Sequence, residues 1–396
     1  MTRFSSLRRI RSLTALLFVC FASALNAQTR YFITDLGTFG GTVGFGYAVN
    51  DQGQVAGASL TKGNNGYRAF RTAPNRPINP VVDDLGTLGG VQSYAQSINN
   101  LGQVAGSAAS TDSAPLHGFR TEPDDPINPS IDDLGTLGGT VSEAWGINNL
   151  GQVVGYASSS GDTILHAFRT APNRAINPAT DDLGTLGGTE SAAFGINDLG
   201  QVTGNASASD DTILHAFRTA PNRAINPATD DLGTLGGTDS FGAAINNLGQ
   251  VTGAAFTSED RSEHAFRTAP NRAINPATDD LGTLGAESYG MAINDLGQVV
   301  GYSFTTRDHT VVHAFLFSGS LMYDLNNLIP AGFGWDLQQA FGINDVGQIV
   351  GIGAHSGGDR PFLLTPASKD LCKKGGWENF GFKDQGQCIQ FVETGK

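Results

Sequence analysis

The chain has 396 residues, with 37 acidic and 24 basic side chains, which give a net charge of −13 at neutral pH. An acidic surface repels the phosphate backbone of nucleic acids, and the basic residues form no cluster or stripe, so nucleic acid is not an expected partner. Only 15% of the residues are charged and 53 are glycine, which favours an all-β protein rich in turns.

Residues 1–27 have the features of a secretory signal peptide. Four arginines precede the apolar run "LTALLFVCFASAL", and the small residues before Ala27 predict cleavage after it. The run is shorter than the roughly 20 residues that a bilayer requires, and Cys20 follows a valine, which makes a poor lipoprotein cleavage site. We therefore expect a secreted or cell-envelope protein without a membrane span, whose net charge becomes −17 because export removes four arginines and no acids.

Residues 28–366 contain seven copies of one unit. The clearest block is "INDLGQVTG" at 196–204, and its glycine recurs every 48 to 50 residues, at Gly53, Gly102, Gly151, Gly200, Gly249, Gly297 and Gly347. A triplet related to "HAF" and a block related to "DLGTLGG" recur in step with it. A fixed period of this length is typical of repeat folds and propellers.

Each unit holds four short segments, and none has the pattern of a helix. In the fourth unit they are "FGIN" (194–197), "GQVTG" (200–204), "LHAFRT" (214–219) and "DDLGTLGG" (230–237). Few residues separate the first two, and Asn, Asp and Gly are the residues that tight hairpins favour. The unit is therefore predicted to be a four-stranded antiparallel meander, about the size of one propeller blade.

The two ends of the repeat region are complementary. Residues 31–41 supply a "DLG" strand that no earlier unit requires, whereas the seventh unit lacks such a strand after "RPFLLTP". A ring closed by lending its first strand to its last sheet has this arrangement and leaves few open sheet edges. The sequence thus predicts an all-β, seven-bladed β-propeller in which the N-terminal strand joins the last blade.

The three recurring blocks resemble the HAF-family extracellular repeat of bacteria, over about residues 31–366. The resemblance implies an exported, β-rich protein and no assigned activity. The first, second and last units depart from the triplet with "RAF", "HGF" and "RPF", which puts in doubt a chemical role for this position in every unit.

The recurring polar residues suggest structural roles. The equivalent histidines would lie too far apart for one metal site, and we expect each to bond a neighbouring turn through an Asp or Thr of the preceding blade; they are His117, His166, His215, His264 and His313. The hairpin turns carry Asp in some copies and Asn in others, which argues against calcium. Adjacent acids such as Asp181 and Asp182 point to opposite faces of a strand and cannot flank one bond. No catalytic residue, metal or cofactor is predicted.

Two connections vary between copies, whereas the hairpin and the proline-containing link scarcely change. These are the loop between the second and third strands and the passage to the next unit, which a meander places on the same rim. Loops on a rigid scaffold often carry recognition, although neutral drift would give the same variation. The candidate binding residues are Asn64, Asn65, Asp112, Glu143, Trp145, Asp162, Asp210, Asp211, Glu259, Asp260, Arg261, Arg307, Asp308 and His309.

Residues 367–396 form a separate tail that resembles a short module at the ends of secreted bacterial proteins. Cys372 and Cys388 are the two cysteines left after export, and a disulfide between them would contribute about 3 kcal/mol. Trp377, Phe380 and Phe382 would form a small core or dock the tail on the ring. The tail is interpreted either as a tether to the cell envelope or a partner, or as a clip beside the closing blade.

Together these features favour a monomeric, non-enzymatic interaction or adhesion module for an extracellular protein or a glycan. One alternative is a propeller hydrolase or lyase with acidic residues near the central opening, where the main departure from the repeat includes Trp335 and Asp336. Another is a purely structural envelope protein. A fold alone does not choose among these functions.

Overall fold

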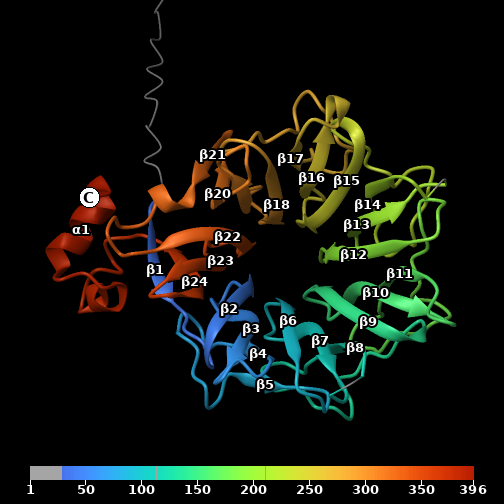
Figure 1. The fold of residues 1–396 in the computed structure, drawn as a ribbon, viewed down its shortest axis with the longest axis horizontal. Coiled ribbons are helices and arrows are strands. Elements are labelled where there is room, and N and C mark those ends of the chain that lie inside the picture. Colours follow the sequence, from blue (N-terminus) through green and yellow to red (C-terminus); the bar gives the residue numbers. More distant parts are fainter. Residues whose placement is uncertain (1–28, 113, 210) are drawn as a thin grey trace, which may run out of the picture.

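The computed structural model describes residues 29–396, apart from residues 113 and 210, so the predicted signal peptide lies outside the described residues. The described chain is all-β, as predicted, and its small antiparallel sheets follow one another around a circle in sequence order (Figure 1). No helix in this part of the chain is long and apolar enough to cross a membrane.

Three consecutive antiparallel strands form the body of every unit, and the seven first strands line the centre of the circle. The first strands are β2 (Gly40–Val49), β6 (Ser93–Ile98), β9 (Gly138–Ile147), β12 (Ser191–Ile196), β15 (Gly236–Ile245), β18 (Ser288–Ile293) and β22 (Asp336–Ile343). The second strands are β3 (Val55–Thr61), β7 (Val104–Ala109), β10 (Val153–Ser159), β13 (Val202–Ser207), β16 (Val251–Thr257), β19 (Val299–Phe304) and β23 (Ile349–His355). The third strands are β4 (Tyr67–Arg71), β8 (Leu116–Arg120), β11 (Leu165–Arg169), β14 (Leu214–Arg218), β17 (Glu263–Arg267), β20 (Val312–Ser318) and β24 (Gly358–Pro366).

A fourth strand was predicted in every unit, but the structure contains it in only some of them. It is a true strand in three units, as β1 (Tyr31–Asp35), β5 (Asp84–Gly86) and β21 (Leu321–Asp324). In the other four it is reduced to a single antiparallel bridge, such as Phe168 with Asp182. After the bridge, Asp182 Oδ1 accepts a hydrogen bond of 2.8 Å from the Gly184 N–H, and Gly184 has φ +72°. The same Asx turn follows Asp35 in β1 and Asp84 in β5, so it ends the fourth segment in units with and without a full strand.

The N-terminal strand β1 closes the circle. It pairs antiparallel with β24, in a register that runs from Tyr31 opposite Pro366 to Asp35 opposite Phe362. The predicted pairing of these two segments is therefore confirmed, and Figure 1 shows β1 beside the last sheet although more than 300 residues separate them in the chain. β24 also meets β2 through one parallel bridge between Asp359 and Val43.

The apolar core is divided into packets between neighbouring units. Phe217 in β14, for example, packs with Val154 and Ala167 of the preceding unit and with Leu183. The equivalent phenylalanine of every "HAF"-related triplet has no exposed surface; the set is Phe70, Phe119, Phe168, Phe217, Phe266, Phe315 and Phe362. Truncating such a side chain to alanine costs about 3–5 kcal/mol, so these residues hold the sheets together.

A circle of hydrogen bonds connects the hairpin turns at the ends of the first strands. In each turn the Asn Nδ2 donates to the backbone carbonyl of the equivalent Asn in the next unit, at 2.8–3.1 Å. The last bond runs from Asn344 to Asn50 and so joins the seventh unit to the first. The contributing residues are Asn50, Asn99, Asn148, Asn197, Asn246, Asn294 and Asn344, each 3–5% exposed.

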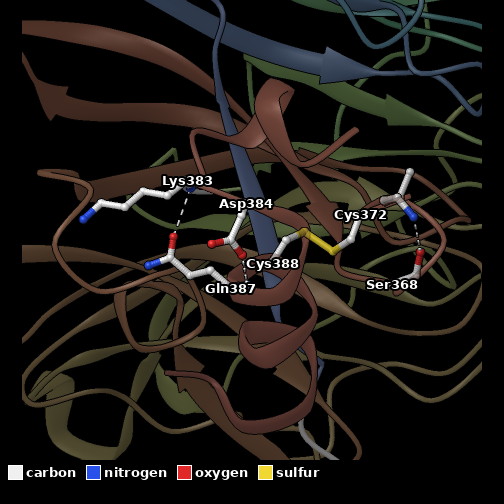
Figure 2. The surroundings of a disulfide bond; sticks show 7 residues. Ser368, Cys372, Lys383, Asp384, Gln387 and Cys388 are labelled. Atoms are coloured by element: carbon white, nitrogen blue, oxygen red, sulfur yellow. Dashed lines mark hydrogen bonds between the residues drawn. A yellow bond between two sulfur atoms is a disulfide. The ribbon is translucent and has the colours of Figure 1, made fainter. Parts of the chain in front are cut away.

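The tail packs outside the circle against β1. Its elements are a 3-10 helix, η3 (Gly376–Phe380), and an α-helix, α1 (Gln385–Thr394), which was not predicted; shorter 3-10 turns within the repeats are η1 (Ser258–Asp260) and η2 (Leu325–Asn327). The disulfide between Cys372 and Cys388 ties the segment before η3 to α1, and Figure 2 shows it beside the Asp384 side chain that caps the helix by accepting from the Gln387 N–H at 2.8 Å.

Phe32 of β1 is the centre of the contact between tail and circle. It is fully buried, and its ring lies 4.3 Å from that of Phe380, 5.6 Å from Phe382 and 5.9 Å from Phe391. Arg30 Nη1 also donates to the Val392 carbonyl at 2.9 Å, near the C-terminal end of α1. The tail therefore holds the strand that closes the circle, as the interpretation of a clip requires.

Candidate binding site

The loop between the second and third strands is hydrogen-bonded to the start of the first strand of the same unit. The Thr140 N–H donates to Asp162 Oδ1 at 2.6 Å, and Ser158 Oγ donates to the same oxygen. These hydrogen bonds, led by that from Ser158, lower the pKa of the Asp162 carboxyl. In three other units, a backbone N–H at the start of the unit donates in the same way to the side chain of Asn64, Asp211 or Asp260. All four acceptor residues have a left-handed backbone, with φ of +49° to +56°. These four candidates are turn residues that join the two variable connections.

The remaining rim candidates are distributed around the circle. Asn65 donates to the Lys62 carbonyl at 3.4 Å, and Asp308 accepts from the Thr310 hydroxyl at 2.8 Å. His309 stacks on Phe304 with 4.7 Å between ring centroids. Asp112 and Arg307 are exposed, and Arg261 follows η1; Asp210 and the side chain of Glu259 lie outside the described residues.

The triplet histidines bond an aspartate of their own unit, which corrects the expectation of a partner in the preceding blade. His166 Nδ1 lies 2.9 Å from Asp182 Oδ2, and the same pairing recurs in five units. The bond raises the pKa of His166 and lowers that of Asp182. In the first unit Arg68 takes the place of the histidine, with Nη2 3.2 Å from Asp84. In these six units the position therefore supplies a hydrogen-bonding partner for the "DLG" aspartate.

The acidic residues considered for catalysis also have structural partners. Asp181 Oδ2 accepts from the Asn177 N–H at 2.8 Å, whereas the adjacent Asp182 faces His166, so the two carboxylates are separated as predicted. Trp335 stacks on His355 at 4.4 Å, and Asp336 Oδ1 lies 3.8 Å from His313 Nε2. The described residues contain no group of three or more His, Cys, Asp or Glu side chains arranged to hold a metal ion.

The aspartates nearest the axis belong to the hairpin turns. Each bonded asparagine is followed in the chain by another Asn or an Asp. The backbone N–H of this following residue donates to the Oδ1 of the equivalent residue in the next unit, at 2.8–3.0 Å. Asp345 lies between Asp295 and Asp51, and burial followed by these like charges raises its pKa. These carboxylates bond neighbouring units on the face of the circle that carries the hairpins, which we call the hairpin face.

A β-bulge recurs in all seven first strands. In β9 the register passes from Gly146 opposite Val154 to Ala144 opposite Gly155, so Trp145 is the extra residue. A Cβ on Gly155 would lie 1.8 Å from the Glu143 carbonyl oxygen, because the bulge brings that carbonyl over the second strand. A side chain at this position would clash with that carbonyl, which explains why the second glycine of "GQVVG" is a glycine. Bulges commonly re-aim a side chain next to a functional site.

All seven bulged residues line one cavity of about 540 Å³ on the axis of the circle. They lie three positions before the bonded asparagines, and they are Tyr47, Gln96, Trp145, Phe194, Ala243, Met291 and Phe341. Phe241, two residues before Ala243, supplies a further aromatic wall. Trp145 is the one rim candidate among the lining residues. The sequence did carry a signal, since this position varies from copy to copy three places before a constant asparagine.

The cavity ends at a ring of β-branched residues. Val49 and the six equivalent isoleucines line a smaller polar cavity of about 180 Å³ formed by the hairpin turns, and five of the seven also line the larger cavity; the five are Val49, Ile147, Ile196, Ile245 and Ile343. Six of these seven side chains are only 8–9% exposed. The first strands run from the variable connections toward the hairpins, so the larger cavity lies on the side of the variable connections, which we call the variable face.

The cavity wall is apolar and uncharged in the described structure. No Asp, Glu, Lys, Arg or His side chain lines it, and burial raises the pKa of the Tyr47 phenol, which keeps it neutral. Its polar side chains besides Tyr47 are Gln96 and Ser97, and Ser97 Oγ is buried with no hydrogen-bond partner in the described part of the chain. Cavities of this size and composition are typical of small-molecule sites.

The chain matches no known protein-family model, and no curated protein matches it.

Proposed function

We propose that the chain is an exported, seven-bladed β-propeller of the HAF-repeat type. It acts as a monomeric, non-enzymatic binding module, secreted or held in the cell envelope, and its ligand is an extracellular protein or glycan. The disulfide is compatible with an oxidising compartment outside the cytoplasm. The pairing of β1 with β24 and the hydrogen bond from Asn344 to Asn50 support the closed ring.

The observation that carries the proposal is the difference between the two faces. On the hairpin face, the same asparagine bonds recur in every unit. On the variable face, the loops differ in sequence and the axial cavity is lined by a different side chain from most units. A rigid scaffold with one individual face is the usual design of a recognition surface.

The proposal is tested with the purified chain after removal of residues 1–27. It is applied to glycan arrays and to immobilised extracellular proteins, and each ligand found is measured again with two variants. Arg307→Ala combined with Asp308→Ala alters the variable face, and Leu248→Ala alters the half-exposed leucine of a hairpin.

We expect the variable-face variant to weaken binding and the hairpin-face variant to leave it unchanged. Equal effects of both, or no ligand in either screen, would contradict the proposal. A hydrolase and lyase screen of the same preparation should show no turnover, and turnover that requires the hairpin aspartates would favour the enzymatic alternative.

A further inference from the structure

We infer that the axial cavity binds an uncharged, flat, ring-containing organic molecule that carries a hydrogen-bonding group on one edge. The inference goes beyond the proposed binding function, because it adds an axial site for a different class of ligand to the recognition by the variable loops.

The cavity is built by a repeated device rather than left by imperfect packing. Each first strand contains a bulge at the same position, and each bulged residue lines the cavity. The positions that follow it are nearly uniform, with a small residue next, a β-branched residue two places later and the bonded asparagine after that. The bulged position itself changes among aromatic, amide, thioether and methyl side chains. The bulge directs one side chain of each first strand into the cavity, and the type of side chain differs between units. This arrangement is suited to forming a binding site.

The aromatic side chains form two arcs. Tyr47 and Phe341, from the first and seventh units, have ring centroids 5.7 Å apart. Trp145, Phe194 and Phe241, from the third, fourth and fifth units, form the other arc, with centroids 5.5 and 4.8 Å apart. The order of the units around the circle places the arcs across the axis from each other. A flat molecule between them would contact aromatic rings on both sides.

The second unit gives the cavity a polar side. It contributes Gln96 and Ser97, and the Ser97 hydroxyl lacks a partner within the described structure. The Ser97 oxygen has almost no accessible surface, so a ligand with one hydroxyl or carbonyl on its edge would bond the Gln96 amide and leave the rest of its surface against apolar walls. The opposite gap between the arcs is filled by Met291, whose thioether packs well against rings.

Charge and polarity exclude two other classes of ligand. An anion would enter a cavity without a cation in an acidic protein. A sugar would bury several hydroxyls against a wall with few polar groups, and unpaired buried hydroxyls are costly. The volume of about 540 Å³ suits a compound with two or three fused rings.

The test is equilibrium dialysis of naphthol against the full chain after signal removal. Naphthol is uncharged at neutral pH, flat, and carries one hydroxyl. We expect saturable binding of one molecule per chain. Trp145→Ala should weaken it roughly tenfold, equivalent to about 1.4 kcal/mol. Trp377→Ala is the matched control, because this indole lies in the tail, and it should leave binding unchanged.

A second variant adds bulk instead of removing it. Gln96→Trp places an indole where the third unit already carries one, so the bulge accommodates it, and it should abolish binding by filling the polar side of the cavity. Naphthalene sulfonate and maltose, offered separately, should bind at least tenfold more weakly than naphthol.

Several results would overturn the inference. They are non-saturable binding of naphthol, an equal loss in Trp145→Ala and Trp377→Ala, unchanged binding in Gln96→Trp, or tighter binding of the sulfonate or the sugar. These outcomes are distinguishable from failure of the proposed function. If a ligand found on the arrays still depends on Arg307 and Asp308 while naphthol does not bind, the binding module stands and the cavity site is wrong.

Discussion

Removal of the Asn148 side chain tests the circle of hydrogen bonds that joins the units. Asn148 is 3% exposed, and its Nδ2 donates to the Asn197 carbonyl at 3.0 Å and to Gln152 Oε1 at 2.9 Å. Its Oδ1 accepts from the N–H groups of Leu150 and Gln152 at 3.1 and 3.0 Å. Four such bonds at about 0.5–1.5 kcal/mol each predict that Asn148→Ala loses about 2–6 kcal/mol of unfolding free energy.

The assay is urea unfolding followed by circular dichroism, with two companion variants. Leu150→Ala lies in the same turn and is half-exposed, so it should cost less than about 0.5 kcal/mol. Asn344→Ala removes the bond to Asn50 across the join between the seventh and first units, and it should cost about as much as Asn148→Ala. If Asn148→Ala is no more damaging than Leu150→Ala, the hydrogen-bond reasoning is refuted.

Three further predictions concern the clip, the disulfide and pH. Phe32→Ala should lower the unfolding free energy by about 3–5 kcal/mol and make the tail sensitive to protease, because Phe32 is fully buried against it; a resistant tail would contradict the clip. Reduction of the Cys372–Cys388 disulfide should destabilise the tail by about 3 kcal/mol and leave the sheets folded, so loss of the β spectrum would refute a separate tail. The pair of His166 and Asp182 should contribute about 0.5–1 kcal/mol, measured as the difference in stability from His166→Ala. Since the pKa of His166 is raised above 6.5 and that of Asp182 lowered below 3.8, this contribution is complete between those values; it declines as pH rises through the histidine's folded-state pKa, or falls through that of the aspartate. A difference that is constant with pH would contradict the pairing.

Much of the β architecture was predictable because the repeat itself carries the information. The complementary ends of the repeat region predict the pairing between Tyr31 and Pro366, since a sheet that lacks its last strand must find one elsewhere. The separation of Asp181 from Asp182 follows from strand geometry. The cysteine pair follows from the count of cysteines after export.

Other features depend on geometry that strand periodicity does not contain. The bulge at Trp145 changes which side chain reaches the axis, so the cavity could not be inferred from an alternating pattern. The fourth strand is reduced to one bridge in four units, although the same Asx turn follows the full strand β5. The variability of loop residues such as Asp162 indicated recognition, but a left-handed backbone and a bonded neighbour give this residue a structural role.

The central claim is that the seventh unit meets the first. It is tested by engineering cysteines at Asp51 and Asp345, whose turns are joined by a 3.0 Å bond from the Asp345 N–H to Asp51 Oδ1. Mild oxidation followed by mass spectrometry of the peptides should reveal an engineered disulfide between these positions. The same experiment with cysteines at Asp51 and Asp198, the equivalent turn three units away, should reveal none. Absence of the first disulfide, or equal yields from both pairs, would contradict the closed circle.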